Sequence, residues 1–280
     1  MSSTILVNGE PTSCVDVRDR GFQYGDGVFT SLPVRQSRPV LLGRHLARLQ
    51  CDCQRLSIPF PGRELLAREA LGLARAGSNG VLKIQITRGP GGRGYRPPAP
   101  ASPTRVLGLH PSPEYPPELW TEGVQVRFCR TRLSHNPGLA GIKHSNRLEQ
   151  ILARAEWDSD EIQEGLMLDQ EGHVTEGTMT NLFLAKSGRV ATPKLDSCGV
   201  AGVVRALILE AAAEFGLAIE ETRLRPEAIY QADELFLTNS VIGVWPVRRL
   251  EDRSFPVGSV TREVSRWLAL RIQEESAFWE

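Results

Sequence analysis

Lys143 is the residue of this sequence whose side chain is best suited to covalent chemistry. The 280-residue chain has only four lysines among its 33 basic residues, namely Lys83, Lys143, Lys186 and Lys194. A primary amine can form an imine with a carbonyl compound, whereas the guanidinium of arginine stays protonated and cannot. A site that needs an imine therefore has few candidates.

The other three lysines lie in ordinary surroundings. Lys83 belongs to an alternating strand and is expected to face solvent, Lys186 lies in a hairpin turn, and Lys194 follows a proline in a loop. Lys143 instead follows an irregular approach, Asn136–Gly141, and precedes a helical run. A loop that leads into a helix can aim a side chain into a cleft, although a solvated lysine near a helix start fits the same pattern.

A predicted amphipathic helix carries the first arginine of interest. Apolar residues recur at spacings of four and three from Leu42 to Leu56, and His45, Arg48 and Arg55 form a polar stripe beside them. The stripe is consistent either with a binding surface or with a solvated basic face.

Glycines mark three further segments. Asp19–Phe29 is expected to be a tight loop, because glycine permits positive φ and close approach of the backbone to a ligand. Arg88–Tyr95 is a glycine-rich loop with two arginines, and it lacks the lysine and hydroxyl pair of a nucleotide phosphate loop. Ser197–Arg205, which contains Gly202, opens a helix whose unpaired amides suit a phosphate.

Three of these features, together with the acid Glu176, describe a pyridoxal phosphate site. Lys143 would hold the aldehyde as an imine and later move a proton, while Arg48 and the amides at Gly202 would bind the phosphate dianion. The carboxylate of Glu176 would keep the pyridine nitrogen protonated, so that the ring accepts electrons.

Composition narrows the class of protein. The length favours two domains, and a formal net charge of zero gives no overall field to attract nucleic acid or acidic lipid, so a small-molecule partner is expected. Five cysteines without a Cys-x-x-Cys pair argue against a disulfide framework and a zinc site, and no metal is expected. No secretory or membrane-spanning pattern is visible, so we expect a soluble, cytoplasmic protein without membrane attachment.

Two proline clusters, one on each side of a strand at 105–110, indicate the domain boundary. We predict an N-terminal α/β domain over 1–112, a linker over 113–119 and a C-terminal domain over 120–280. Helices are expected at 42–56, 64–76, 147–157, 203–216 and 260–275. Strands are expected at 81–88, 105–110, 124–129, 164–169, 180–184, 190–192, 219–222, 234–238 and 242–248.

From Tyr24–Phe29 to Trp245–Val247, the sequence resembles the fold-type IV pyridoxal phosphate enzymes. Two stretches, Arg88–Tyr95 and Asn136–Gln150, point within that family to the aminodeoxychorismate lyases. The resemblance implies a two-domain, D-amino acid aminotransferase-like α/β (α+β) fold. It has a smaller N-terminal α+β domain and a larger, mixed β-barrel-like C-terminal domain with helices, which carries Lys143 and most cofactor contacts. It also implies a homodimer.

The resemblance assigns roles residue by residue. Lys143 matches the Schiff-base lysine and catalytic base, Glu176 the partner of the pyridine nitrogen, and Arg48 the phosphate arginine. Further cofactor contacts are expected from Gly202, Val203, Val204, Asn239 and Ser240.

Two of these positions depart from the pattern of relatives. Val204 stands where relatives often carry threonine, which loses a hydroxyl contact but not an amide. Asn239 occupies a position that is glycine in many aminotransferases, and we expect it to narrow or polarise the pocket.

The implied reaction converts 4-amino-4-deoxychorismate to 4-aminobenzoate and pyruvate in folate synthesis. The substrate carries two carboxylates, which arginine can bind bidentately, so Arg93 is the first candidate, with Arg88 and Tyr95 behind it. A loop arginine paired with a surface acid is the alternative for Arg93. A fold-type IV aminotransferase acting on branched-chain or D-amino acids is the alternative function.

Overall fold

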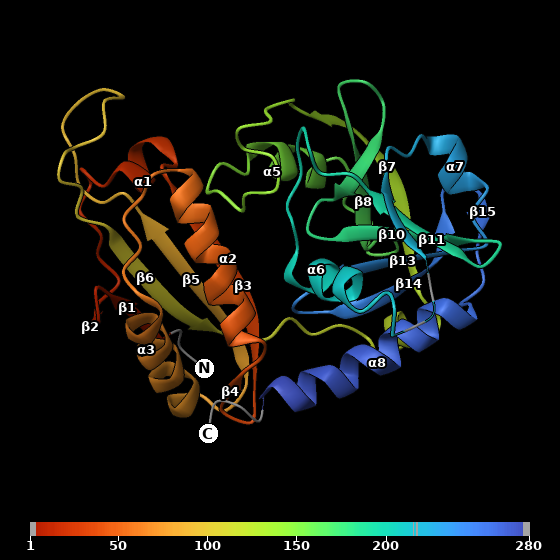
Figure 1. Ribbon diagram of the computed structural model, residues 1–280, viewed down its shortest axis with the longest axis horizontal. Coiled ribbons are helices and arrows are strands. Elements are labelled where there is room, and N and C mark those ends of the chain that lie inside the picture. The colour runs from red at the N-terminus through yellow and green to blue at the C-terminus, as the bar shows by residue number, and fades with distance from the viewer. Residues whose placement is uncertain (1–3, 215, 217, 277–280) are drawn as a thin grey trace. The chain divides into compact units, whose positions relative to one another are not determined.

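The computed structural model describes residues 4–214, 216 and 218–276, and the chain folds into two units (Figure 1). Unit 1 draws on Met1–Pro113, Lys143–Asn146 and Arg271–Glu280, and unit 2 on Glu114–Ile142 and Arg147–Leu270. The division after Pro113 falls in the second proline cluster, where the linker was expected. Lys143 was expected in the C-terminal domain, but the structure places it in unit 1.

Unit 1 is built on a six-stranded antiparallel sheet in the order β2-β1-β6-β5-β3-β4. Its strands are β1 (Thr4–Val7), β2 (Glu10–Pro11), β3 (Gly27–Arg35), β4 (Arg38–Pro39), β5 (Gly80–Thr87) and β6 (Thr104–His110). The sequence analysis missed β3 and the short helix α1 (Arg20–Tyr24), because it interpreted the glycines of that region as a loop. Val28, Thr30 and Leu32 of β3 are fully buried on one face of the sheet.

Helices α2 (Leu42–Arg55) and α3 (Arg63–Ala76) lie over one face of this sheet (Figure 1). Both confirm the predicted helices within one residue at each end. The apolar seam of α2 is buried as its spacing predicted, with Leu46 and Leu49 almost fully removed from solvent. His45 and Asp52 of the same helix are buried as well, which the apolar pattern did not predict.

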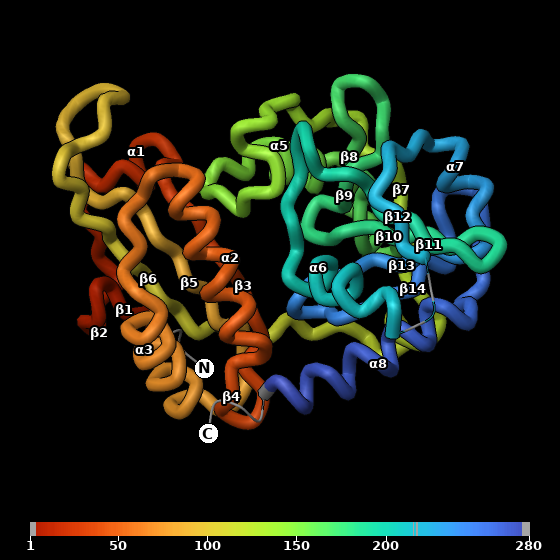
Figure 2. The backbone as a smooth tube through the Cα atoms, in the orientation of Figure 1, coloured from red at the N-terminus to blue at the C-terminus, as the bar shows by residue number. Residues whose placement is uncertain are grey.

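Unit 2 contains a nine-stranded mixed sheet. Eight of its strands follow the order β12-β11-β10-β13-β14-β7-β8-β9, and β15 pairs with β14. The strands are β7 (Val124–Leu133), β8 (Glu164–Asp169), β9 (Val174–Gly177), β10 (Asn181–Lys186), β11 (Arg189–Pro193), β12 (Ile219–Thr222), β13 (Glu234–Asn239), β14 (Gly243–Leu250) and β15 (Arg253–Ser254). Strand β9, at one end of the order, also contacts β10 and β11 near the other end, so the sheet curls on itself (Figure 2). This curl agrees with the β-barrel-like domain that was expected.

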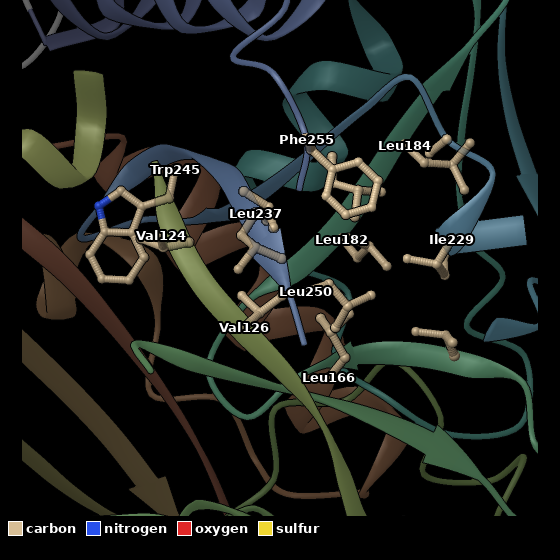
Figure 3. Close-up of a cluster of buried hydrophobic side chains, with 14 of the residues drawn as sticks. Val124, Val126, Leu166, Leu182, Leu184, Ile229, Leu237, Trp245, Leu250 and Phe255 are labelled. Atoms are coloured by element: carbon tan, nitrogen blue, oxygen red, sulfur yellow. The ribbon is translucent and has the colours of Figure 1, made fainter. Parts of the chain in front are cut away.

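The core of unit 2 is formed by apolar side chains that several strands direct inward (Figure 3). Trp245 of β14 is fully buried there, near Val124 of β7 and Leu237 of β13. Burying a large apolar side chain stabilises the fold by roughly 1.5–3 kcal/mol. This packing provides the rigid base from which the loops of unit 2 project.

Five helices accompany the sheet of unit 2. They are α4 (Glu118–Thr121), α5 (Leu148–Arg154), α6 (Val203–Glu210), α7 (Pro226–Tyr230) and α8 (Ser259–Ser276), which closes the chain. Helix α6 ends earlier than predicted, and Phe215, expected in it, lies outside the described residues. Helix α5 is also shorter than predicted, and Leu148, Ile151 and Leu152 are 72%, 61% and 60% exposed.

Candidate active site

Lys143 lies in an extended segment that pairs with unit 1, five residues before α5 begins. Its backbone is held on both sides: Phe29 N donates to Lys143 O at 3.0 Å, and Lys143 N donates to Asp52 Oδ2 at 3.2 Å. The ammonium Nζ lies 4.8 Å from the centre of the Phe29 ring. The sequence analysis had expected Lys143 to be positioned by the start of a helix. Instead, its backbone is held by β3 and α2.

The other three lysines are exposed, whereas Lys143 is half-buried. Lys186 Nζ donates to Gln231 at 3.0 Å, and Lys194 pairs with Asp196 at 3.1 Å. Lys83 Nζ lies 5.1 Å from the Phe29 ring centre, so it is the other lysine near that ring. Lys143 thus differs from all three in its burial.

Arg48 is half-buried on α2 rather than part of a solvated face. Its Nη2 donates to Thr30 Oγ1 at 2.5 Å, and its buried Nε has no hydrogen-bond partner in the part of the chain that the structure describes. Burial lowers the pKa of the guanidinium to about 10, against the attraction of Asp52, so it stays cationic at neutral pH. A desolvated cation with an unfilled donor is suited to bind an anion.

Two buried polar residues of α2 flank this arginine. Burial, and then the charges of Arg48 and Lys143, hold the pKa of His45 well below its ordinary value, so the imidazole is neutral. Burial raises the pKa of Asp52, which the nearby cations oppose. The sequence analysis did not single out Asp52. Its position four residues after Arg48 on the same helical face was the signal that could have found it.

Arg88, predicted as a substrate ligand, is buried and used by the protein itself. Its Nε and Nη2 donate to the two oxygens of Asp26 at 2.8 and 3.0 Å, and the carbonyls of Leu56 and Ser57 accept from Nη2 and Nη1. Burial alone would raise the pKa of Asp26, but hydrogen bonds from Arg88 and Arg20 outweigh it and lower that pKa. These contacts use four of the five N–H donors of Arg88, so they do not support its predicted role as a substrate ligand.

The loop after Arg88 presents its remaining candidates to solvent. Arg93 is exposed, and the Tyr95 side chain is 86% exposed, in edge contact with Tyr24 at 5.6 Å between ring centres. Arg20 donates to the carbonyls of Gly94 and Tyr95 at 2.9 and 3.1 Å. The backbone of the loop is therefore tied to unit 1 while the guanidinium of Arg93 stays accessible.

Glu176 lies on β9 in unit 2, with only 4% of its surface exposed. Its Oε2 accepts from Val200 N at 2.8 Å, and its Oε1 accepts from Gln150 Nε2 at 3.4 Å. The carboxylate is thus oriented by a backbone amide of the turn that precedes α6.

That turn is held by backbone contacts on both sides. Gly141 pairs with Val200 in a parallel bridge, through Gly141 N to Gly199 O at 2.9 Å and Ala201 N to Gly141 O at 3.0 Å. Asn181 Nδ2 donates to Val200 O at 2.9 Å. The approach loop and the turn before α6 are therefore one assembly within unit 2.

Gly202 is required where it stands as the N-cap of α6. A Cβ at this position would lie 2.1 Å from Asn181 Oδ1, so no other residue fits without a shift. The side chains of Val203 and Val204 are buried, and their amides open the helix at the positive end of its dipole. The structure therefore brings Glu176 and the Gly202–Val204 turn together in unit 2, as it brings Lys143 and Arg48 together in unit 1.

The turn after β13 contains Asn239 and Ser240, the last two predicted cofactor ligands. Asn239 Oδ1 accepts from the amides of Val241 and Ile242 at 2.8 and 2.9 Å, and its Nδ2 donates to Met179 O at 3.2 Å. Its amide is thus used to close the β13–β14 turn, which corrects its assignment as a cofactor ligand. Ser240 is half-buried, and Thr238 Oγ1 is buried without a partner in the described ranges, a group that the sequence analysis did not identify.

Comparison with known proteins places this geometry. Residues 27–250 match the family described as amino-transferase class IV. The aminodeoxychorismate lyase of Vibrio harveyi is 37% identical over 262 residues, which cover 92% of this chain and 97% of that protein. The crystal structure of 4-amino-4-deoxychorismate lyase from Pseudomonas aeruginosa is 48% identical with a TM-score of 0.91, covering 94% of this chain and 97% of that one. A putative branched-chain-amino-acid aminotransferase of Methanocaldococcus jannaschii is 29% identical over 93% of each protein.

The chain belongs to the aminotransferase class IV family, since the match covers most of its length. Its two sheets with their helices confirm the fold-type IV architecture that the sequence resemblance implied. No helix among the described residues is long and apolar enough to cross a membrane.

Proposed function

We propose that this chain is a pyridoxal phosphate-dependent aminodeoxychorismate lyase, which converts 4-amino-4-deoxychorismate to 4-aminobenzoate and pyruvate in folate synthesis. The observation that carries the reaction is the pattern of identity: 48% and 37% to two lyases over nearly full length, against 29% to an aminotransferase. The observation that carries the cofactor is Lys143, a half-buried amine beside a cationic, incompletely bonded arginine.

Two residues of unit 1 carry chemical groups that the cofactor requires. Lys143 supplies the primary amine that holds the aldehyde, and its backbone contacts to Phe29 and Asp52 fix where that amine projects. Arg48 binds the phosphate, because its unfilled Nε and desolvated charge call for an anion. The neutrality of His45 leaves Arg48 without a second buried cation on the adjacent turn.

Unit 2 carries the remaining chemical groups that the proposal needs. Glu176, held by the Val200 amide, keeps a proton on the pyridine nitrogen. The amides of Val203 and Val204 at the start of α6 bind phosphate oxygens, and Ser240 adds a hydroxyl. Val204 contributes no side-chain hydroxyl, so its contact is confined to the backbone.

The chemistry is divided between cofactor and protein. When bound, pyridoxal phosphate supplies an electron-accepting ring that stabilises negative charge on an adjacent carbon. Lys143, once the substrate amine has displaced it, removes the proton from the amine-bearing carbon of the substrate. Elimination of enolpyruvate, by cleavage of the bond between the ring carbon and the ether oxygen, then makes the substrate ring aromatic, and protonation of the enol gives pyruvate. Aromatisation favours the elimination, which requires no keto acid acceptor.

We assign substrate carboxylate binding to Arg93, with Tyr95 beside it in the same loop. The exposed guanidinium and the glycines on either side of Arg93 support this choice. Arg88 is excluded from the role by its four contacts to Asp26, Leu56 and Ser57.

Two further assignments complete the proposal. The protein acts as a homodimer, supported by the apolar, exposed Leu148, Ile151 and Leu152 on α5, which a second copy can cover. It acts in the cytoplasm, supported by five cysteines that are all free, as expected of a reducing compartment.

The test is to supply purified holoprotein with 4-amino-4-deoxychorismate, without any keto acid, and to follow 4-aminobenzoate by its fluorescence. We expect fluorescence to rise with equimolar release of pyruvate. The absence of 4-aminobenzoate, together with rapid conversion of the cofactor to its amine form by an amino acid donor, would favour the aminotransferase instead.

A further inference from the structure

The fully buried polar side chains of Thr30 and His45 lie next to Arg48 and have no role in the proposed chemistry. Thr30 lies on β3 between Val28 and Leu32, which are also fully buried, and His45 lies one helical turn before Arg48 on α2. A hydroxyl and an imidazole in such an apolar layer are costly unless they are hydrogen-bonded. Their contacts therefore indicate what they do.

The three side chains form one chain of hydrogen bonds. Thr30 Oγ1 lies 2.5 Å from Arg48 Nη2 and 2.6 Å from His45 Nδ1. A guanidinium can only donate, so the threonine oxygen accepts from Arg48. The remaining question is whether the hydroxyl donates to His45 or accepts from it.

The count of unsatisfied groups decides the direction. If Nδ1 carried the proton, the Thr30 hydroxyl hydrogen would have no acceptor in the described part of the chain, and His45 Nε2 would be an unfilled acceptor. If Thr30 donates to Nδ1, only the Nε2–H of His45 stays unpartnered. Because each buried unsatisfied group costs free energy, the second arrangement is favoured. The hydrogen bonds then run from Arg48 to Thr30 to His45.

We propose that Thr30 and His45 are positioning residues that fix the guanidinium of Arg48 for the cofactor phosphate. This inference rests on the proposed function, which assigns the phosphate to Arg48. Thr30 holds one end of the guanidinium and leaves its other donors to the ligand. Neutral His45 accepts a hydrogen bond from the Thr30 hydroxyl at Nδ1, which makes the hydroxyl oxygen a better acceptor for Arg48, and the neutral ring adds no positive charge beside the guanidinium.

The affinity of the apoprotein for pyridoxal phosphate, compared with its affinity for pyridoxal, tests this role. Pyridoxal lacks the phosphate but reacts with the same lysine. The dissociation constant of pyridoxal divided by that of pyridoxal phosphate therefore isolates the phosphate contribution to affinity. Thr30→Val removes the hydroxyl at nearly constant volume, and we expect it to lower that ratio about tenfold, the loss of one hydrogen bond to a charged group. Thr30→Ser keeps the hydroxyl and should stay within about twofold of wild type. Affinity for inorganic phosphate should follow the same order.

A merely structural role would lower the thermal stability of Thr30→Val and leave the ratio unchanged, which would overturn the proposal. Arg48→Gln separates this failure from failure of the proposed function, because an unchanged ratio in that variant would move the phosphate away from Arg48 altogether. If Thr30→Val does not fold, Thr30→Ala removes the same hydroxyl and decides in its place, and an unchanged ratio in that variant would likewise overturn the proposal. In ¹⁵N NMR spectra of histidine-labelled wild type, assigned with His45→Asn, we expect His45 protonated at Nε2. Protonation at Nδ1 would contradict the proposed direction of the hydrogen bonds.

Discussion

The surroundings of Arg88 and of Arg48, both in unit 1, show two uses of a guanidinium removed from solvent. Arg88 gives a two-pronged contact to Asp26 and reaches two backbone carbonyls. Arg48 has a single hydrogen bond, to Thr30, and a buried Nε without a partner among the described residues. The local sequence pattern does not show this difference, since Arg88 directly follows an apolar strand and Arg48 lies beside the apolar seam of a helix.

A structural arginine therefore differs from a binding arginine in how many of its N–H donors are already hydrogen-bonded, and burial alone does not separate the two. A guanidinium with most of its donors used, as four of the five N–H donors of Arg88 are, has little left to offer a ligand, whereas one with unfilled donors lowers its free energy by taking an anion. The same reasoning applies to Asn239, whose amide is used by its own turn.

The largest effect is expected for Lys143→Ala. We expect the visible absorption of the bound cofactor to vanish and turnover to fall by at least roughly 10²–10⁴-fold, because the base is lost. The circular dichroism spectrum should be unchanged. Lys83→Ala is the matched control near the same Phe29 ring and should retain both absorption and activity.

Substitution of Arg88 should chiefly lower the free energy of unfolding, whereas substitution of Arg48 should chiefly lower the affinity for the cofactor. Arg88→Ala leaves Asp26 with one partner fewer in a partly buried pair, a change that costs roughly 3–5 kcal/mol of unfolding free energy. Arg48→Gln should instead weaken pyridoxal phosphate binding by about ten- to a hundredfold, with a far smaller loss in stability. Denaturant unfolding and cofactor titration measure the two losses. Equal losses of stability in both variants would remove the distinction.

Two buried glutamates of unit 2 extend the comparison. Glu176→Gln should retain the cofactor but slow turnover by roughly ten- to a hundredfold, since a neutral amide no longer keeps the pyridine nitrogen protonated. Glu164, whose carboxylate accepts from Gly165, Thr178, Met179 and Thr180, should affect stability instead when changed to glutamine. Unchanged turnover in Glu176→Gln would assign the pyridine nitrogen to another acid.

Arg93→Ala tests the exposed arginine of the loop, in contrast to Arg88, whose donors are mostly used within the protein. Loss of a charged hydrogen bond should lower kcat/KM by about ten- to a hundredfold, chiefly through KM, with cofactor affinity unchanged. Arg93→Lys should recover only part of this loss, because an ammonium cannot make two parallel contacts to a carboxylate. Wild-type kcat/KM in Arg93→Ala would move carboxylate recognition elsewhere.

The smallest effect concerns two carboxylates of unit 1 whose pKa values shift in opposite directions. Hydrogen bonds from the two arginines, outweighing burial, lower the pKa of Asp26, so its stabilising contribution is present above its unfolded pKa and is lost as the pH falls through its folded pKa. Burial raises the pKa of Asp52, so the folded state gains stability as that group protonates. As the pH falls from 7 to about 4, the stability of wild type relative to Asp52→Asn should therefore rise, whereas relative to Asp26→Asn it should fall only as the pH drops further, below the ordinary carboxyl pKa of about 3.9. Trends of the same sign would contradict the assignment.

Much of the fold could be predicted from local patterns. The seam from Leu42 to Leu56 gave α2 and Glu164–Asp169 gave β8, because helical and strand periodicities are local properties of the chain. Strand β3 was missed because the glycines of Asp19–Phe29 hid its start, and its Thr30 faces inward only because α2 covers it. The exposed apolar side chains of α5 could not be distinguished from a buried seam, since the pattern does not say what covers a helix.

The candidate site also has a part that could be predicted from the sequence and a part that could not. Lys143, Arg48 and Glu176 were chosen for the chemical groups that pyridoxal phosphate requires and by the family resemblance, and their roles stay predictions. Whether an arginine or an asparagine has donors left over depends on residues distant in the chain. Asp26 lies 62 residues before Arg88, and Met179 lies 60 residues before Asn239. No local pattern records such contacts.

The central claim, that Lys143 is the amine that holds the cofactor, has a direct chemical test. Borohydride reduction of the holoprotein fixes the cofactor to whichever lysine carries it, and peptide mass spectrometry then locates the modified residue among the four lysines of the chain. We expect the added mass on the peptide that contains Lys143 alone. The same mass on the peptide that contains Lys83, or on none of the four, would contradict the account.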